Sequence, residues 1–364
     1  MRRWSGKRNL SPLVLALAAV GCGPLGYYGQ AISGGAGMLL QRRAIEAVLE
    51  RPDTSPELAL RLRLVQELRV FARDELALPV GDAFSHYVDL ERPYAVWNVV
   101  AAPELSVEPL IWCFPVAGCV SYRGYFSERA ARGFAARLER EGFDVAVQGA
   151  AAYSTLGWFA DPVLSTFVGY PEPDLAALLF HELAHREVYV RDDTTFNESF
   201  ATAVEEEGLR RWLERSPLPG GMDSYRARRR AERELVRRVL SCRERLAEVY
   251  AAATAEEAKR AEKAGLLAAL RAGADDPELG PYGPWLGQDL NNAHLASMGE
   301  YRALVPFFQR LLAEHGRDLP RFYAAVAELA ELPADQRPTG TTEVSLRAPS
   351  GCAGAARPGR AART

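Results

Sequence analysis

Two histidines four residues apart are the clearest chemical feature of this 364-residue chain, which contains only five histidines. They are His181 and His185, in the run Leu-Leu-Phe-His-Glu-Leu-Ala-His. On a helix, residues i and i+4 project from one face about a turn apart, so both imidazoles could bind one metal ion. Glu182 lies beside that face and is suited to accept a proton from water that the metal activates. The spacing predicts a zinc site with Glu182 as a general base.

The alternative interpretation is a buried helix whose histidines are satisfied by hydrogen bonds alone. The helix around the motif is almost wholly apolar, so each histidine and the glutamate needs a polar partner there. A metal ion supplies such a partner, which favours the metal site. The apolar neighbours are Leu178, Leu179, Phe180, Leu183 and Ala184.

A catalytic zinc site needs a third protein ligand. The spacing HExxHxxGxxH does not occur, because Val188 and Arg191 occupy the glycine and third-histidine positions. Downstream, the residues Asn-Glu-Ser-Phe-Ala at 197–201 resemble the NExxA motif that follows HExxH in the gluzincins. That resemblance implies Glu198 as the third ligand. The step from His185 to Glu198 is shorter than in thermolysin-like enzymes and the large aminopeptidase families.

Two further polar residues are expected behind the ligands. Glu205 follows Glu198 by about two helical turns on the same face. From there it could orient a ligand histidine, or replace Glu198 as a ligand. Asn197 is the other residue expected to support the metal site.

The resemblance extends over roughly residues 22 to 332, to a family of bacterial putative aminopeptidases. It implies a zincin-like fold, a Zn²⁺ cofactor and hydrolysis of a peptide bond in a peptide or protein substrate. The segments that carry the resemblance are 22–31, 114–126, 153–159, 161–165, 181–185, 197–201 and 291–297.

A strand ahead of the motif helix is a candidate for binding substrate. In zincins an edge strand runs beside the cleft and pairs with extended substrate backbone. A core strand whose Trp158 and Phe159 simply pack is an equally good interpretation. The candidate residues are Ser154, Thr155, Leu156, Gly157 and Trp158.

The hydrogen-bond donor for the developing oxyanion is also open. Gluzincin-like enzymes often use a tyrosine or histidine from the C-terminal lobe, which makes His294 and Tyr301 candidates. Structural packing is the alternative for either residue, and Tyr122 and Tyr125 are further candidates.

The expected fold class is α+β and zincin-like. Residues 38–170 are expected to form an N-terminal lobe with a small mixed sheet and helices. Residues 171–216 should contain the two zinc-site helices, and residues 217–332 a mainly helical C-terminal lobe. The Pro-, Thr- and Ala-rich segment 333–364 is expected to be a disordered tail.

Helical periodicity places the motif on a helix over 173–189 and the second motif on a helix over 196–214. Residues 223–250 and 254–272 are expected to pack as a solvated helical hairpin. The arginine-rich run 226–230 is expected on its solvated face or against an anionic membrane surface.

The N-terminus has the pattern of an export signal over residues 1–21. Its apolar run is too short to span the roughly 30 Å of a bilayer core. Residues 19–22, Ala-Val-Gly-Cys, resemble the lipobox of bacterial lipoproteins, which implies lipid on Cys22 and an anchoring linker over 22–37. A plain signal peptide with an incidental cysteine is the alternative. Gly23 follows the cysteine, so we expect a periplasmic lipoprotein of the bacterial cell envelope, anchored in the outer membrane.

Composition and charge bear on the possible function. The formal net charge is −3, so no overall positive charge is present to hold nucleic acid. Cys113 and Cys119 could form a disulfide in an exported protein, or remain two buried thiols. The sequence thus predicts a zinc aminopeptidase held at the membrane by lipid on Cys22, with an envelope endoprotease or a non-catalytic zincin scaffold as alternatives. Glu182 favours an enzyme, because a scaffold has no need of that carboxylate.

Overall fold

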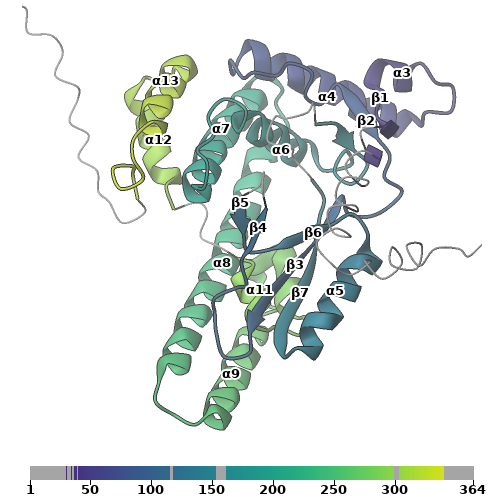
Figure 1. The fold of residues 1–364 in the computed structure, drawn as a ribbon. Coiled ribbons are helices and arrows are strands. Elements are labelled where there is room, and N and C mark those ends of the chain that lie inside the picture. The colour runs from purple at the N-terminus through teal and green to yellow at the C-terminus, as the bar shows by residue number, and fades with distance from the viewer. Residues whose placement is uncertain are drawn as a thin grey trace, which may run out of the picture.

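The structure is α+β, with many helices and three small sheets (Figure 1). None of the helices that it describes is long and apolar enough to cross a membrane. This computed structural model describes residues 30, 34, 37–38, 40–114, 118–152, 161–298 and 303–339. Several predictions concern residues outside this part: the signal 1–21, Cys22, the strand 154–158 and Tyr301. Most of the 22–37 linker and most of the tail also lie outside it.

Strand β3 (Val96–Pro103) is the centre of an antiparallel three-stranded sheet. It pairs along its whole length with β7 (Phe143–Ala150) and at its other edge with β6 (Arg123–Tyr125). Helix α5 (Glu128–Arg140) covers one face of this sheet, and the short helix α11 (Asn292–Ala296) covers the other (Figure 1). Both faces are therefore buried.

The side chains of β3 explain this arrangement. Successive residues of a strand point to opposite faces. Val99 and Ala101 pack in the cluster with α5, whereas Val100 packs with Ala293 and Ala296 of α11. An apolar residue at nearly every position thus suits a strand that is covered on both sides.

The other two sheets are smaller. Strand β2 (His86–Val88) pairs antiparallel with β1 (Arg43–Ala44) and parallel with β8 (Val163–Leu164), so this sheet is mixed. Strands β4 (Trp112–Phe114) and β5 (Gly118–Val120) form a separate antiparallel pair. The lobe for which the sequence predicted one small mixed sheet therefore contains three.

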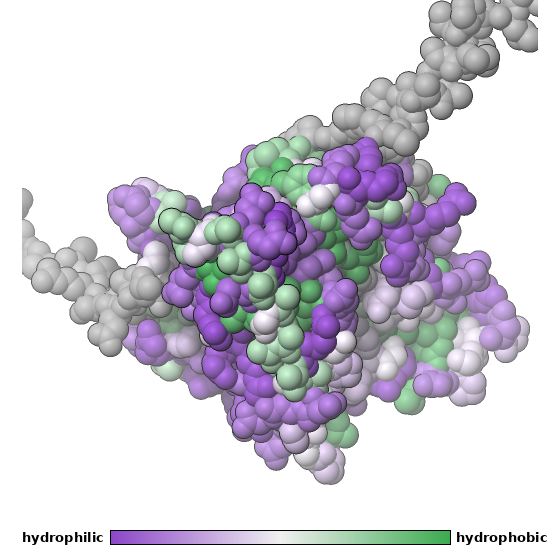
Figure 2. Space-filling view, turned by 90° about the horizontal axis from the view of Figure 1, so that it is seen from below, coloured by the Kyte–Doolittle hydropathy of each residue, from purple (hydrophilic) through white to green (hydrophobic). Residues whose placement is uncertain are grey.

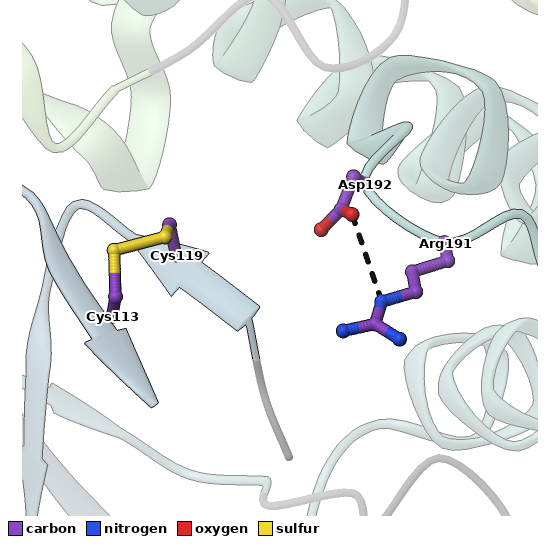
Figure 3. The surroundings of a disulfide bond; sticks show 4 residues. All are labelled: Cys113, Cys119, Arg191 and Asp192. Atoms are coloured by element: carbon purple, nitrogen blue, oxygen red, sulfur yellow. Dashed lines mark ion pairs between the residues drawn. A yellow bond between two sulfur atoms is a disulfide. The ribbon is translucent and has the colours of Figure 1, made fainter. Parts of the chain in front are cut away.

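A disulfide joins Cys113 of β4 to Cys119 of β5 (Figure 3). Of the two interpretations left open by the sequence, the structure has the disulfide. The same close-up shows Arg191 and Asp192, which form an exposed ion pair in the loop after the motif helix.

The largest core packs around helices α6 (Glu172–Ala184) and α7 (Thr194–Arg215). Helix α4 (Pro56–Asp74) contributes to it, as do α12 (Val305–Glu314) and α13 (Leu319–Ala330) near the C-terminus. This core therefore combines residues from the N-terminal, central and C-terminal parts of the chain.

Gly208 lets α7 lie close to α6. A Cβ atom at this position would be 2.8 Å from both Phe180 Cδ2 and Leu76 Cδ1, closer than packed carbon atoms normally approach. Trp212 fixes the same pair of helices, since its indole N–H donates to Glu172 Oε1 at 3.0 Å. The close packing at Gly208 and the hydrogen bond of Trp212 hold together α6 and α7, the two helices that carry the sequence motifs.

Helices α8 (Gly221–Ala251) and α9 (Glu256–Arg271) form the long hairpin that extends from the body in Figure 1. The face seen from below in Figure 2 is mostly hydrophilic, with smaller hydrophobic areas between the hydrophilic residues. The hairpin has its own small core, whose members include Leu235, Val239, Leu246, Leu266 and Leu267.

Several element boundaries differ from those predicted. Residues 38–50 do not form one continuous helix: residues 38, 40 and 41 are helical, Arg43 and Ala44 pair with β2, and α3 (Ile45–Leu49) follows. The motif helix ends at Ala184, five residues early. Helix α12 begins at Val305 with Pro306 in its first turn, a position where the missing N–H of proline is harmless.

Short helices form in the Pro- and Gly-rich segment 277–287. They are the 3₁₀ helix η1 (Pro277–Tyr282) and the one-turn helix α10 (Gly283–Leu286). Both pack against α8 or each other, so tertiary contacts stabilise turns that Pro and Gly composition alone suggested were irregular.

Glu207 of α7 is a buried carboxylate that joins three arginines. It accepts hydrogen bonds from Arg210, Arg211 and Arg317, and the last of these lies in the turn between α12 and α13. Burial by itself raises the pKa of Glu207, but the hydrogen bonds from Arg210, Arg317 and Arg211 outweigh it and leave the pKa at about 2.

We expect Glu207→Gln to lower the free energy of unfolding at neutral pH by about 1–3 kcal/mol, because three arginines lose a charged partner. The folded-state pKa is depressed, so this stabilisation is present above pH ~4.5 and is lost as pH falls toward ~2. Denaturant unfolding of both proteins across this pH range measures the effect, with Glu139→Gln at an exposed position of α5 as control. A difference that does not shrink with falling pH would contradict it.

Candidate metal centre

The two motif segments meet where α6 ends and α7 begins. Helix α6 runs to Ala184, and His185 is its C-terminal cap, so His181 and His185 remain one turn apart. Helix α7 begins after Asp193, whose carboxylate accepts a hydrogen bond from the Phe196 N–H at 3.1 Å. This cap places Glu198 in the second turn of α7, beside the end of α6.

Asn197 fixes the short loop between these helices. Its Oδ1 accepts from the Val190 N–H at 2.8 Å, and its Nδ2 donates to Val190 O at 2.7 Å. Asn197 is buried, so the two bonds are shielded from water. It therefore supports the site by holding the loop backbone, which accounts for the short step between the second histidine and the glutamate.

Three side chains converge on one point. His181 Nε2 lies 3.2 Å from His185 Nε2 and 3.2 Å from Glu198 Oε2. His185 Nε2 lies 3.5 Å from Glu198 Oε1. The rings of His181 and His185 are nearly perpendicular, at 85°, so that both Nε2 atoms face the carboxylate.

This triangle fits a divalent cation. Ligand bonds of about 2.0–2.1 Å at tetrahedral angles put neighbouring donor atoms ~3.3 Å apart. The two Nε2 atoms are separated by nearly that value, and each lies about as far from one of the two Glu198 oxygens. One donor atom from each of the three residues lies within 4.8 Å of the others. His181, His185 and Glu198 could therefore hold a metal ion.

Glu205 supports one of the two histidines. Its Oε2 lies 2.9 Å from His181 Nδ1, and its Oε1 accepts a hydrogen bond from the Tyr225 hydroxyl at 2.8 Å. Of the two roles considered from the sequence, this geometry corresponds to orienting a ligand histidine. The buried Nδ1 of His185 has no hydrogen-bond partner among the described residues.

The electrostatics of the site favour positive charge beside His181. Burial lowers the pKa of His181, but hydrogen bonds with Glu198 and Glu205 and the charges of Glu205 and Glu182 raise it to about 10. Burial and the neighbouring His181 lower the pKa of His185 to about 4. The carboxylates therefore stabilise one positive charge at the two histidines. A bound metal ion would place its positive charge in the same surroundings.

Glu205 itself stays ionised. Burial raises its pKa, but the hydrogen bond and charge of His181, with Arg229 and Tyr225, outweigh burial and leave the pKa at about 2. Burial raises the pKa of Tyr225 above its ordinary value, so its hydroxyl keeps the proton that it donates.

A cavity of about 500 Å³ opens beside the triangle, between α6 and α8. Glu182, which is not one of the three converging donors, lines this cavity together with His181 and Glu205. The cavity continues along α6 toward Asp174, with Tyr225 and Arg229 of α8 on the opposite wall. Its size is in the usual range for a small-ligand site.

A family model described as putative aminopeptidase matches residues 26–340. The chain belongs to this family. Neither a curated protein nor a solved structure matches the chain. In this member of the putative aminopeptidase family, the matched span contains both helices of the metal centre and the α8 wall of the cavity.

His294, one of the two predicted oxyanion donors, lies elsewhere in this family member. Its Nδ1 is 2.8 Å from Asn291 Oδ1, and its ring packs edge-on against Trp285. Asn291 donates to Val145 O, which ties α11 to the sheet. His294 therefore packs beside the sheet and does not line the cavity with Glu182. Tyr301 lies outside the described residues.

The structure adds residues of α8 that sequence reasoning missed. The arginine-rich run was predicted to be a solvated or membrane-facing surface. Arg226 and Arg230 are exposed, as expected. Arg228, however, pairs with Asp174 of α6, and Arg229 donates to Glu232 at 2.7 Å, and all four of these residues line the cavity. The sequence spacing of Tyr225, Arg228, Arg229 and Glu232 places them on one face of a helix. It does not predict which other element that face contacts.

Proposed function

We propose that this member of the putative aminopeptidase family is a zinc metallopeptidase that hydrolyses peptide bonds, acting as an aminopeptidase on peptide or protein substrates. The observation that carries the proposal is the convergence of His181, His185 and Glu198, of which His181 lines a cavity together with Glu182. A metal site with only a structural role does not need a separate carboxylate on an open cavity. The arrangement supports the zincin-like fold expected from the sequence.

The donor set suits zinc. Two imidazole nitrogens and one carboxylate oxygen at tetrahedral spacing are a common catalytic zinc environment. When bound, the ion would lower the pKa of a water molecule and polarise the substrate carbonyl. Glu182 would accept the proton of the attacking water and return it to the leaving amine. Glu205 keeps the Nδ1 proton of His181, so that Nε2 presents its lone pair to the metal position.

Aminopeptidase action requires a group that holds the α-ammonium of the substrate. Glu205 is already bonded to His181 and Tyr225, which leaves Asp174 and Glu232 as other acidic side chains on the cavity wall. Both of Arg228's bonds to Asp174 use the same oxygen, Oδ1. Both carboxylates already pair with arginines of α8, so the family match supports the aminopeptidase assignment more than these side chains do.

Metal analysis and peptide cleavage test this function together. We expect the purified protein to contain about one zinc per chain, to lose peptidase activity on chelation and to regain it with added zinc. We expect peptides with free amino termini to be cleaved and their acetylated counterparts to be resistant. Equal cleavage of both sets would instead support an endoprotease. Bound zinc without cleavage of any peptide would support the non-catalytic scaffold.

We also propose that the protein is a lipoprotein of the bacterial cell envelope, anchored in the outer membrane through lipid on Cys22. The charged and apolar residues of 1–21 and the Ala-Val-Gly-Cys sequence at 19–22 support this. Labelled fatty acid should enter the wild-type protein and not Cys22→Ser. Equal labelling of the two proteins would disprove the assignment.

A further inference from the structure

Tyr225 contacts the metal centre through a carboxylate. It lies in the second turn of α8, more than forty residues after His181, and its side chain is 4% exposed. The hydroxyl donates to Glu205 Oε1 at 2.8 Å, and the other oxygen of the same carboxylate lies 2.9 Å from His181 Nδ1. One carboxylate therefore connects Tyr225 to a candidate metal ligand.

Each of these hydrogen bonds constrains the next group. Glu205 is 6% exposed, so both of its oxygens need protein partners. Because Tyr225 satisfies Oε1, Oε2 is directed at His181 Nδ1. A carboxylate at Nδ1 keeps the proton on that nitrogen, which leaves the lone pair on Nε2, the atom that faces His185 and Glu198.

The ring of Tyr225 is itself held in place by α8. The guanidinium of Arg229 lies 5.9 Å from the centre of the ring, and Arg229 Nη1 donates to Glu232. Contacts thus connect Arg229 and Tyr225 of α8, through Glu205 of α7, to His181 of α6. His185 has no matching support, since its Nδ1 has no hydrogen-bond partner among the residues that the structure describes.

We propose that Tyr225 is a positioning residue of the metal centre, which orients His181 through Glu205 and so sets the affinity for zinc. The inference rests on the proposed zinc site but not on peptide hydrolysis. Helix α8 then contributes to metal binding although it supplies none of the three converging donors.

Tyr225→Phe removes only the hydroxyl, and Tyr250→Phe is a matched control. Tyr250 is also on α8 and also donates its hydroxyl to a side chain, Asn292 Oδ1, at 2.9 Å, but it belongs to the hairpin core. Losing a group that bonds directly to a ligand histidine lowers metal affinity ~10–100-fold. Tyr225 acts one step further away, so we expect a loss of about 3- to 30-fold for Tyr225→Phe.

The affinity is measured by competition between the full chain and a chromophoric zinc chelator. Tyr250→Phe should retain the wild-type affinity within about twofold. Thermal melting of the zinc-free proteins shows whether either variant is simply less folded. If the two variants bind zinc equally well, Tyr225 does not position the site and the proposal is wrong.

A double-mutant cycle with Glu205→Gln separates positioning from general stability. If Tyr225 acts through Glu205, Tyr225→Phe should lower zinc affinity less in the Glu205→Gln background than in the wild-type background. Additive effects would overturn the proposal even if both single variants bind zinc weakly. A wild-type protein that binds zinc but cleaves no peptide would remove the proposed function and leave this inference intact.

Discussion

We expect Glu182→Gln to lower the proposed peptide hydrolysis strongly while the zinc content stays at the wild-type level. Glu182 lines the cavity and is not one of the three converging donors, so its loss removes a proton acceptor and leaves the metal ligands in place. General acid–base catalysis contributes about 10²- to 10⁴-fold to a rate, and a decrease of that size in kcat is expected. Steady-state kinetics and metal analysis of the same preparation measure both quantities.

Glu187→Gln is the matched control for this experiment. It removes a carboxylate five residues further on, at an exposed position just after α6, and should retain wild-type activity. If Glu182→Gln cleaves peptides as fast as the wild-type protein, either a contaminant or another base is responsible, and the role assigned to Glu182 is wrong.

The second large effect concerns the third ligand. We expect Glu198→Gln to lose stoichiometric zinc, because a neutral amide replaces the only carboxylate among the three converging groups. Losing a direct ligand should weaken binding by more than the ~100-fold upper range for supporting groups. Equilibrium dialysis and metal analysis give the affinity, and Glu214→Gln on the exposed end of the same helix is the control.

Zinc that remains bound at one equivalent in Glu198→Gln would exclude Glu198 as a required ligand. Glu205 is then the alternative that the sequence left open, although its Oε2 lies 2.9 Å from His181 Nδ1 and not beside Nε2. Glu205→Gln distinguishes the two cases: it should weaken binding if Glu205 only orients His181, and abolish it if Glu205 is the ligand.

The metal triangle could be anticipated because its information is local. His181 and His185 share a helix, and the 3.6-residue period places them on one face whatever the rest of the fold does. Glu198 was implied by the resemblance to NExxA, and Glu205 followed from the period of the same helix. In the structure these four side chains lie together where α6 and α7 meet.

Contacts between distant segments could not be predicted from local spacing in the sequence. The periodicity of α8 indicates that Tyr225 and Arg229 share a face, but an amphipathic pattern does not say which surface that face meets. For His294 the sequence left two roles open, oxyanion donor or packing residue. A histidine in the C-terminal part is a reasonable oxyanion donor by residue type, but the bonds of Asn291 hold α11 against the sheet and direct His294 elsewhere.

Local spacing thus predicted His181 and His185 as candidate ligands and Glu182 as the candidate base, and the resemblance to NExxA added Glu198, because side-chain direction along a helix depends mainly on backbone geometry. The packing of α8 against α6 and α7 decided the rest: the cavity beside Glu182, the paired arginines on its wall and the support of His181 by Tyr225 through Glu205. These features depend on long-range burial and ion pairing, which bring together residues that no sequence period relates.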